Sequence, residues 1–203
     1  MTVDPRAITQ FSRTVPELEE FVLFAIVVAG KRSDLQSRKL DAFLRSGPRA
    51  SSPFGVIRSL ERRGQLVEAI EAQRLGQYRR IVAAFACVAS SGLDLRACSV
   101  ADLEAIPGIG PKTARFFLLH SRPGVRVAAL DTHILSWMRS QGFKTPAVTP
   151  QSAAAYGRLE REFLALADRA GVTVADFDLD IWKGRQTGAG VAKAPRRASR
   201  AVR

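Results

Sequence analysis

The chain has 203 residues, an apolar share of 46% and a formal net charge of +12 at pH 7. This length can form one sizeable domain, or two small ones that share a cleft, without disulfides to stabilise the core. The most apolar run, residues 21–28, is far shorter than the ~20 residues that span a bilayer, and the N-terminus does not resemble a signal peptide, so we expect no membrane segment.

The positive charge is unevenly distributed. Seven basic residues follow the last acidic residue, Asp180, and subtracting them from +12 leaves about +5 on the rest of the chain. A positive surface is expected of a protein that meets phosphates, although a merely solvated surface gives the same balance. The two cysteines, Cys87 and Cys98, are too few for a four-ligand zinc site, and we expect both to be reduced. We therefore expect no metal site and, without a membrane segment or signal peptide, a cytoplasmic protein.

Apolar residues recur at helical spacing along the chain, and no stretch shows the alternation of a half-buried strand. We therefore predict an all-α protein. Glycine, proline and capping residues divide the pattern into predicted helices at residues 15–30, 33–47, 53–63, 65–73, 77–91, 99–107, 111–120, 132–140, 149–171 and 173–182. The first helix is apolar on several faces, so we expect it at the centre of the fold. Residues 183–203 lack apolar periodicity and are predicted to be a disordered basic tail, which either binds phosphates or only aids solubility.

The segment Leu103–Thr113 reads Leu-Glu-Ala-Ile-Pro-Gly-Ile-Gly-Pro-Lys-Thr, which predicts a helix, a glycine hairpin and a second helix that begins at Pro111. Glycine at 108 and 110 permits unusual backbone torsions and allows a phosphate to approach the amides. The positive end of the second helix also favours an anion there. We predict contacts to the DNA backbone at four positions, namely Gly108, Ile109, Gly110 and Thr113.

This hairpin, together with Ala-Leu-Asp-Thr-His-Ile-Leu at residues 129–135, resembles the helix-hairpin-helix DNA glycosylase superfamily. More loosely, the likeness covers most of the chain. The resemblance implies a two-lobed fold with DNA across the cleft between the lobes. We place the first lobe at residues 15–130, with the helix-hairpin-helix at 99–120, and form the second from residues 1–14 and 131–182.

Members of the superfamily with lysine at the position of Lys112 act as lyases as well as glycosylases, so the resemblance implies that Lys112 is the nucleophile. Lysine attacks only as the neutral amine, and the positive end of the second helix disfavours the ammonium form. A phosphate contact is the other interpretation of Lys112. Asp131 would stabilise positive charge on the sugar or assist proton transfer from the lysine. Its other interpretation is a plain helix N-cap, worth about 1 kcal/mol.

The turn Leu75-Gly-Gln-Tyr-Arg79 is similar to a glycine-tyrosine turn in endonuclease III, where a side chain fills the gap left by an extruded base. The resemblance implies this role for Gln77, although a surface glutamine is the alternative, and Arg79 is a candidate phosphate contact. Endonuclease III carries a four-cysteine iron–sulfur cluster, whereas this chain has no cysteine after Cys98, so we expect no such cofactor. Whether the hairpin holds a monovalent cation stays open.

We therefore predict a base-excision repair enzyme associated with the nucleoid, a DNA glycosylase and AP lyase acting on double-stranded DNA as a monomer. The absence of a cluster together with the presence of the lysine favours an oxidised base, such as 8-oxoguanine, as the substrate. Two other classes stay open, a non-catalytic helix-hairpin-helix DNA-binding module and a DNA base-modifying transferase on the same scaffold. The module predicts salt-sensitive binding without turnover, and the transferase requires a pocket for a co-substrate.

Overall fold

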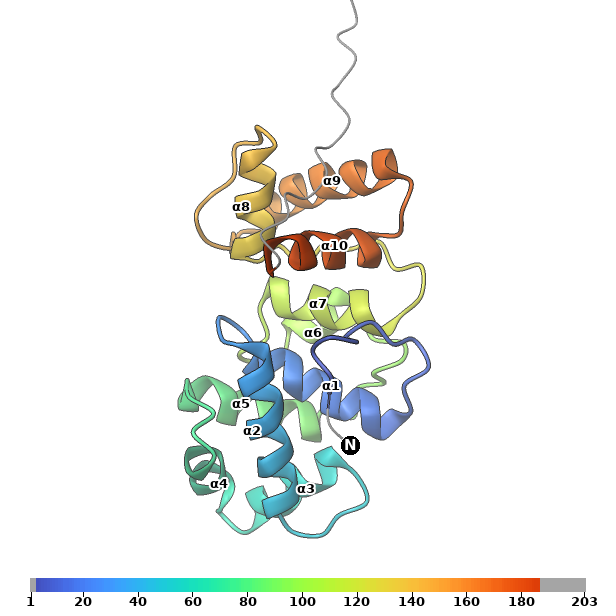
Figure 1. Cartoon of the computed structure of the whole chain (residues 1–203). Helices are drawn as coiled ribbons and strands as arrows, with labels where there is room; N and C mark the ends of the chain where they lie inside the picture. The colour runs from blue at the N-terminus through green and yellow to red at the C-terminus, as the bar shows by residue number, and fades with distance from the viewer. Residues whose placement is uncertain (1–2, 187–203) are drawn as a thin grey trace, which may run out of the picture. The chain divides into compact units, whose positions relative to one another are not determined.

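A computed structural model describes residues 3–186, and most of the predicted basic tail, residues 187–203, lies outside this range. Within the described residues the chain forms ten helices and no strands, which confirms the all-α prediction. In chain order the helices are α1 (Val15–Val27), α2 (Ser33–Ser46), α3 (Pro53–Arg62), α4 (Leu66–Ala72), α5 (Tyr78–Ser90), α6 (Val100–Glu104), α7 (Pro111–Ser121), α8 (Thr132–Ser140), α9 (Ala153–Ala170) and α10 (Val174–Gln186) (Figure 1). Each of them, within residues 3–186, is too short or too polar to pass through a bilayer.

The chain divides into two compact units, Met1–Pro123 with α1 to α7 and Gly124–Arg203 with α8 to α10. We refer to them as unit 1 and unit 2. The division falls seven residues before the one predicted from sequence, between residues 130 and 131. The cleft between two lobes stays a prediction.

Helix α1 forms the centre of unit 1, as its apolar sequence predicts. Each residue in the stretch Phe21–Val27 is at most 1% exposed, and the helix packs against α2, α3, α5 and α7. A helix that is apolar on several faces is stable only when neighbours cover those faces. Its start is fixed by a capping box in which Thr14 and Glu17 bond one another's side chain and backbone.

The N-terminal segment packs onto unit 1, whereas the sequence placed residues 1–14 with the second lobe. Arg13, only 5% exposed, has its guanidinium 3.9 Å from the centre of the Phe21 ring. The guanidinium donates three hydrogen bonds, to the backbone oxygens of Ile8 (2.7 Å), Gln10 (2.7 Å) and His120 (2.8 Å). Burial lowers the pKa of Arg13 to about 10, so it stays charged at neutral pH. A buried cation held by three carbonyl groups ties this segment to the end of α7.

Unit 2 is built around an aromatic cluster contributed by all three of its helices. The ring centroids of Trp137, Phe163 and Phe177 lie 5.2 to 6.5 Å apart, and these side chains are at most 8% exposed. In unit 2, two helix boundaries differ from the prediction by four residues each. Helix α9 begins after Ser152, whose hydroxyl accepts from Ala155 N, rather than at residue 149. Helix α10 continues to Gln186, four residues beyond the predicted end.

Candidate nucleic-acid interface

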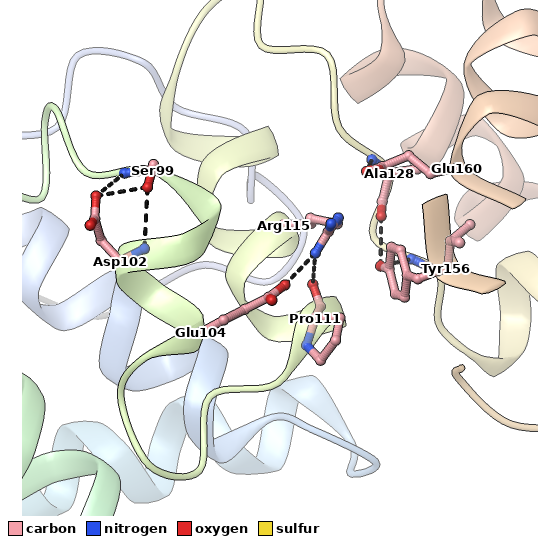
Figure 2. Close-up of polar contacts among 9 residues, drawn as sticks. Ser99, Asp102, Glu104, Pro111, Arg115, Ala128, Tyr156 and Glu160 are labelled. Carbon is pink, nitrogen blue, oxygen red and sulfur yellow. Dashed lines mark hydrogen bonds and ion pairs between the residues drawn. The ribbon is translucent and has the colours of Figure 1, made fainter. Parts of the chain in front are cut away.

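The hairpin of unit 1 joins α6 to α7 as the sequence predicts. Ser99 caps α6 through a capping box with Asp102 (Figure 2). Two hydrogen bonds to the Asp102 carboxylate lower its pKa, the one from the Ser99 amide having the larger effect and the one from the Ser99 hydroxyl the smaller. The chain then turns, with Ile109 N donating to Ile106 O at 3.0 Å. Ile106 and Ile109 are each only 4% exposed, so two apolar side chains lie beneath the turn and hold the helices together.

The two hairpin glycines are required for different reasons. Gly108 has φ +85°, a left-handed conformation that side chains resist, and a Cβ there would lie 2.9 Å from both Cγ and the backbone oxygen of Arg80. Gly110 has φ −95° and ψ 177°, which any residue adopts, so the expectation of unusual torsion at this position is wrong. A Cβ on Gly110 would meet no atom within 4 Å. Gly108 is therefore needed by the fold, while Gly110 leaves open space beside the start of α7.

Arg80 links the hairpin to two other parts of unit 1. Its guanidinium donates to Gln77 Oε1 (2.7 Å), Gly108 O (2.9 Å) and Ile26 O (2.8 Å). Burial lowers the pKa of Arg80 below its ordinary value. Through its bonds to Gly108 O and Ile26 O, Arg80 connects the hairpin to the central helix α1. Nothing in the Tyr-Arg-Arg pattern of residues 78–80 distinguishes Arg80 from its neighbour Arg79, which is exposed.

The turn before α5 is unusually tight. Arg74 and Gln77 both have left-handed φ angles, +50° and +48°, and Gly76 between them has φ +70°. Non-glycine residues in this region cost about 1 to 3 kcal/mol and persist where surrounding contacts impose them. Here Lys31 Nζ donates to Leu75 O, and Lys39 Nζ to Arg74 O. The pKa of Lys31 is lowered mainly by desolvation and to a smaller extent by repulsion from Arg80 and Lys39.

The strained turn presents Gln77 at the surface of unit 1. Its side chain is exposed but not loose, because its carbonyl oxygen accepts from Arg80 Nε. Arg80 thus holds Gln77 and Gly108 at once, so two of the predicted DNA contacts lie on either side of one arginine. The insertion of Gln77 between bases stays a prediction.

Helix α7 carries Lys112 in its first turn. Lys112 is half-buried, and its Nζ lies 4.4 Å from the centre of the Phe116 ring one turn later. Glu104 of α6 accepts from Arg115 Nη1 at 2.5 Å, and the same nitrogen also donates to Pro111 O at 3.2 Å (Figure 2). The Arg115 side chain is 15% exposed, so this ion pair is partly desolvated. The pair fixes the start of α7, and with it the backbone of Lys112, relative to α6.

The predicted contact residues of the hairpin differ in accessibility. Gly108 is exposed and Gly110 half-buried, whereas Ile109 and Thr113 are only 4% and 6% exposed. Ile109 and Thr113 therefore offer little surface to a phosphate, whether from side chain or backbone. Their role in binding stays a prediction.

In unit 2, Asp131 is the N-cap of α8, as its sequence position predicts. Its Oδ1 accepts from both His133 N and Ile134 N at 2.8 Å. The residues before it are held by α9, because Tyr156 Oη donates to Ala128 O (2.8 Å) and accepts from Leu130 N (3.0 Å), and Glu160 accepts from Ala128 N (2.9 Å) (Figure 2). Tyr156 is 1% exposed, so its two bonds are shielded from water. The position of Asp131 within unit 2 is therefore closely defined.

Residues 93–119 match the model of the helix-hairpin-helix motif. This match spans α6, the turn and α7 in full except for the last two residues of α7. The motif suggests DNA binding, in agreement with the coarse level of the resemblance drawn from sequence. No solved structure matches this chain.

The structure brings some of the predicted site residues together and leaves others in separate units. The motif residues, Lys112 and Gln77 lie in unit 1, and Asp131 lies in unit 2. The convergence of Lys112 and Asp131 on one nucleotide therefore stays a prediction. Sequence reasoning missed Tyr156 and Glu160, which position the segment before Asp131. They occupy ordinary helix positions twenty-five and more residues downstream, and no local pattern marks them.

Proposed function

We propose that this protein is a base-excision repair DNA glycosylase with associated AP lyase activity, in which Lys112 is the nucleophile and Asp131 the assisting carboxylate. One observation carries the proposal. Lys112 is half-buried in the first turn of the second helix of a motif that suggests DNA binding.

The proposed reaction begins when the neutral Lys112 amine attacks C1′ of the damaged nucleotide. The bond from C1′ to the base breaks, and the base leaves with that electron pair and takes up a proton. Loss of the amine proton and opening of the sugar ring give a Schiff base between Lys112 and the sugar. Removal of a proton from C2′ then expels the 3′ phosphate by elimination, which breaks the strand.

Asp131 contributes charge in this proposal. A carboxylate at a helix N-terminus is stabilised as the anion by the amides that it accepts from, here His133 N and Ile134 N. An anion beside the sugar stabilises the positive charge that develops as the base leaves. Gln77 would enter the gap left by the extruded nucleotide, and the strained turn that carries it supports this role. The enzyme would act as a cytoplasmic monomer on double-stranded DNA.

A non-catalytic DNA-binding module is the second candidate function. The N-cap bonds of Asp131 favour it, because they give the carboxylate a structural purpose that needs no chemistry. Under this alternative the hairpin binds DNA, no lesion is processed, and Asp131→Asn leaves binding unchanged.

A borohydride trapping assay on duplexes with one lesion each, including an abasic site, tests the proposal. We expect a covalent adduct with at least one lesion, and we expect Lys112→Gln to reduce it at least 100-fold. The control is Lys183→Gln, which removes the same charge from α10 and should leave the adduct yield unchanged. An adduct that survives Lys112→Gln, or the absence of any adduct across the whole panel, would contradict the lyase proposal.

A further inference from the structure

Unit 2 contains an open groove whose lining comes from three neighbouring segments. Its volume is about 900 Å³, and it is lined by the end of α8, the loop of residues 143–152 and the first turns of α9. Three side-chain bonds to backbone oxygens hold the loop, Arg139 Nη2 to Pro146 O (2.8 Å), Thr145 Oγ1 to Leu135 O (2.9 Å) and Thr149 Oγ1 to Leu130 O (2.8 Å). The groove is therefore a shaped feature of unit 2.

The lining combines apolar surface with positive charge. Phe143, Val148 and Leu159 are among its apolar side chains, and Val148 is 68% exposed. Among the residues that the structure describes, the charged ones in the lining are three cations, Arg139, Lys144 and Arg158, and none is acidic. Gln151 and Ser152, at the N-terminus of the 18-residue helix α9, also line the groove, so the positive end of this helix dipole adds to the field.

This positive charge is a local feature. Residues 124–184 contain seven basic and seven acidic residues and are neutral as a whole, yet three of the seven basic residues line the groove. Arg158 also pairs with Glu162 at 3.4 Å, but the arginine side chain remains 52% exposed. An exposed ion pair of this kind is worth little, so Arg158 remains available to a stronger anion.

We propose that this groove binds the phosphodiester backbone of DNA as a second contact, separate from the helix-hairpin-helix. The inference rests on the DNA binding within the proposed function and adds the surface of unit 2 that takes part. The cations of the lining suit the phosphates of one strand, and its apolar side chains suit the deoxyribose faces. Because the motif and the groove belong to one chain, binding of one raises the effective concentration of DNA at the other, so two weak contacts give useful affinity.

The test compares two double variants with the same change of charge in the full-length chain. Lys144→Gln/Arg158→Gln removes two groove cations, whereas Arg161→Gln/Arg169→Gln removes two exposed cations of α9 that do not line the groove. Arg139 is left intact because it also holds the loop. The affinity for an undamaged duplex is measured at several salt concentrations. Each lost phosphate contact lowers the slope of log K against log salt by about 0.9.

We expect the groove variant to lose about two units of slope and about tenfold in affinity near physiological salt, and the control variant to retain the slope. Equal losses in both variants would overturn the proposal, because they would indicate a general effect of net charge. Unchanged slopes in both would also overturn it. Saturable binding of the mononucleotide dAMP that only the groove variant loses, with the DNA slope unchanged, would instead assign the groove to a small molecule.

The same measurements separate this proposal from the enzymatic one. If the protein processes no lesion but shows the slope difference, the groove proposal stands and the glycosylase proposal fails. If the protein gives a Lys112 adduct without a slope difference, the glycosylase proposal stands and the groove proposal fails.

Discussion

The hairpin of unit 1 and the start of α8 in unit 2 hold their functional groups by different means. In the hairpin, the shape of the backbone holds the turn in place, because Gly108 has a left-handed conformation and its backbone packs against that of Arg80. At the start of α8, side chains of α9 hold the backbone, because Tyr156 and Glu160 form hydrogen bonds to the residues that lead to Asp131. The first arrangement leaves a glycine signature in the sequence, and the second leaves none.

The largest effect is expected where the charge of Asp131 is separated from its capping role. Asp131→Asn and Asp131→Ser both keep a side-chain oxygen that accepts from the α8 amides, so the melting temperature should change by no more than about 2 °C. The charge is lost, and we expect lesion processing to fall about 100-fold or more, measured under single-turnover conditions. Turnover that survives in both variants would reduce Asp131 to a structural cap.

Substitution of the two hairpin glycines separates the needs of folding from those of binding. Gly108→Ala places a Cβ in a left-handed conformation 2.9 Å from backbone, so we expect about 2 to 3 kcal/mol of lost stability in urea unfolding. Gly110→Ala meets no atom and should cost no more than about 0.5 kcal/mol. It should nevertheless weaken DNA binding several-fold, because a methyl group would occupy the space beside the amides. Wild-type binding by Gly110→Ala would show that no phosphate approaches there.

A smaller effect is expected from the two neighbouring arginines of α5. Arg80→Gln removes donors from Gly108 O and Ile26 O and should lower stability by about 1 to 2 kcal/mol, with a few-fold loss of DNA affinity. Arg79→Gln, at an exposed position, should leave stability unchanged and lower the salt dependence of binding by about one phosphate contact. Equal stability losses would mean that Arg80 does not link the hairpin to α1.

Much of the fold could be predicted from local sequence, because the helix boundaries depend on local chemistry. Pro111 begins α7 and Asp131 caps α8 at the predicted positions. Where a side chain bonds a distant partner, local patterns fail. Thr149 looks like the start of a helix, but its hydroxyl bonds Leu130 O, and α9 begins after Ser152 instead.

The candidate site shows the same division. The hairpin and the accessibility of Gly108 could be expected from the glycine and proline spacing. The internal role of Arg80 could not, because it depends on α1 and the hairpin meeting at one guanidinium group. The docking of the N-terminal segment through buried Arg13 was missed for a similar reason, since its carbonyl partners include His120, far along the chain.

The most direct test of the central claim is to locate the covalent bond. The adduct trapped with borohydride is digested with protease and nuclease, and the peptide that carries the reduced sugar remnant is sequenced by mass spectrometry. We predict that the remnant lies on Lys112, in the peptide that begins the second helix of the motif. A remnant on any other amine, such as Lys31, Lys144 or the N-terminus, would contradict the assignment of Lys112 as the nucleophile.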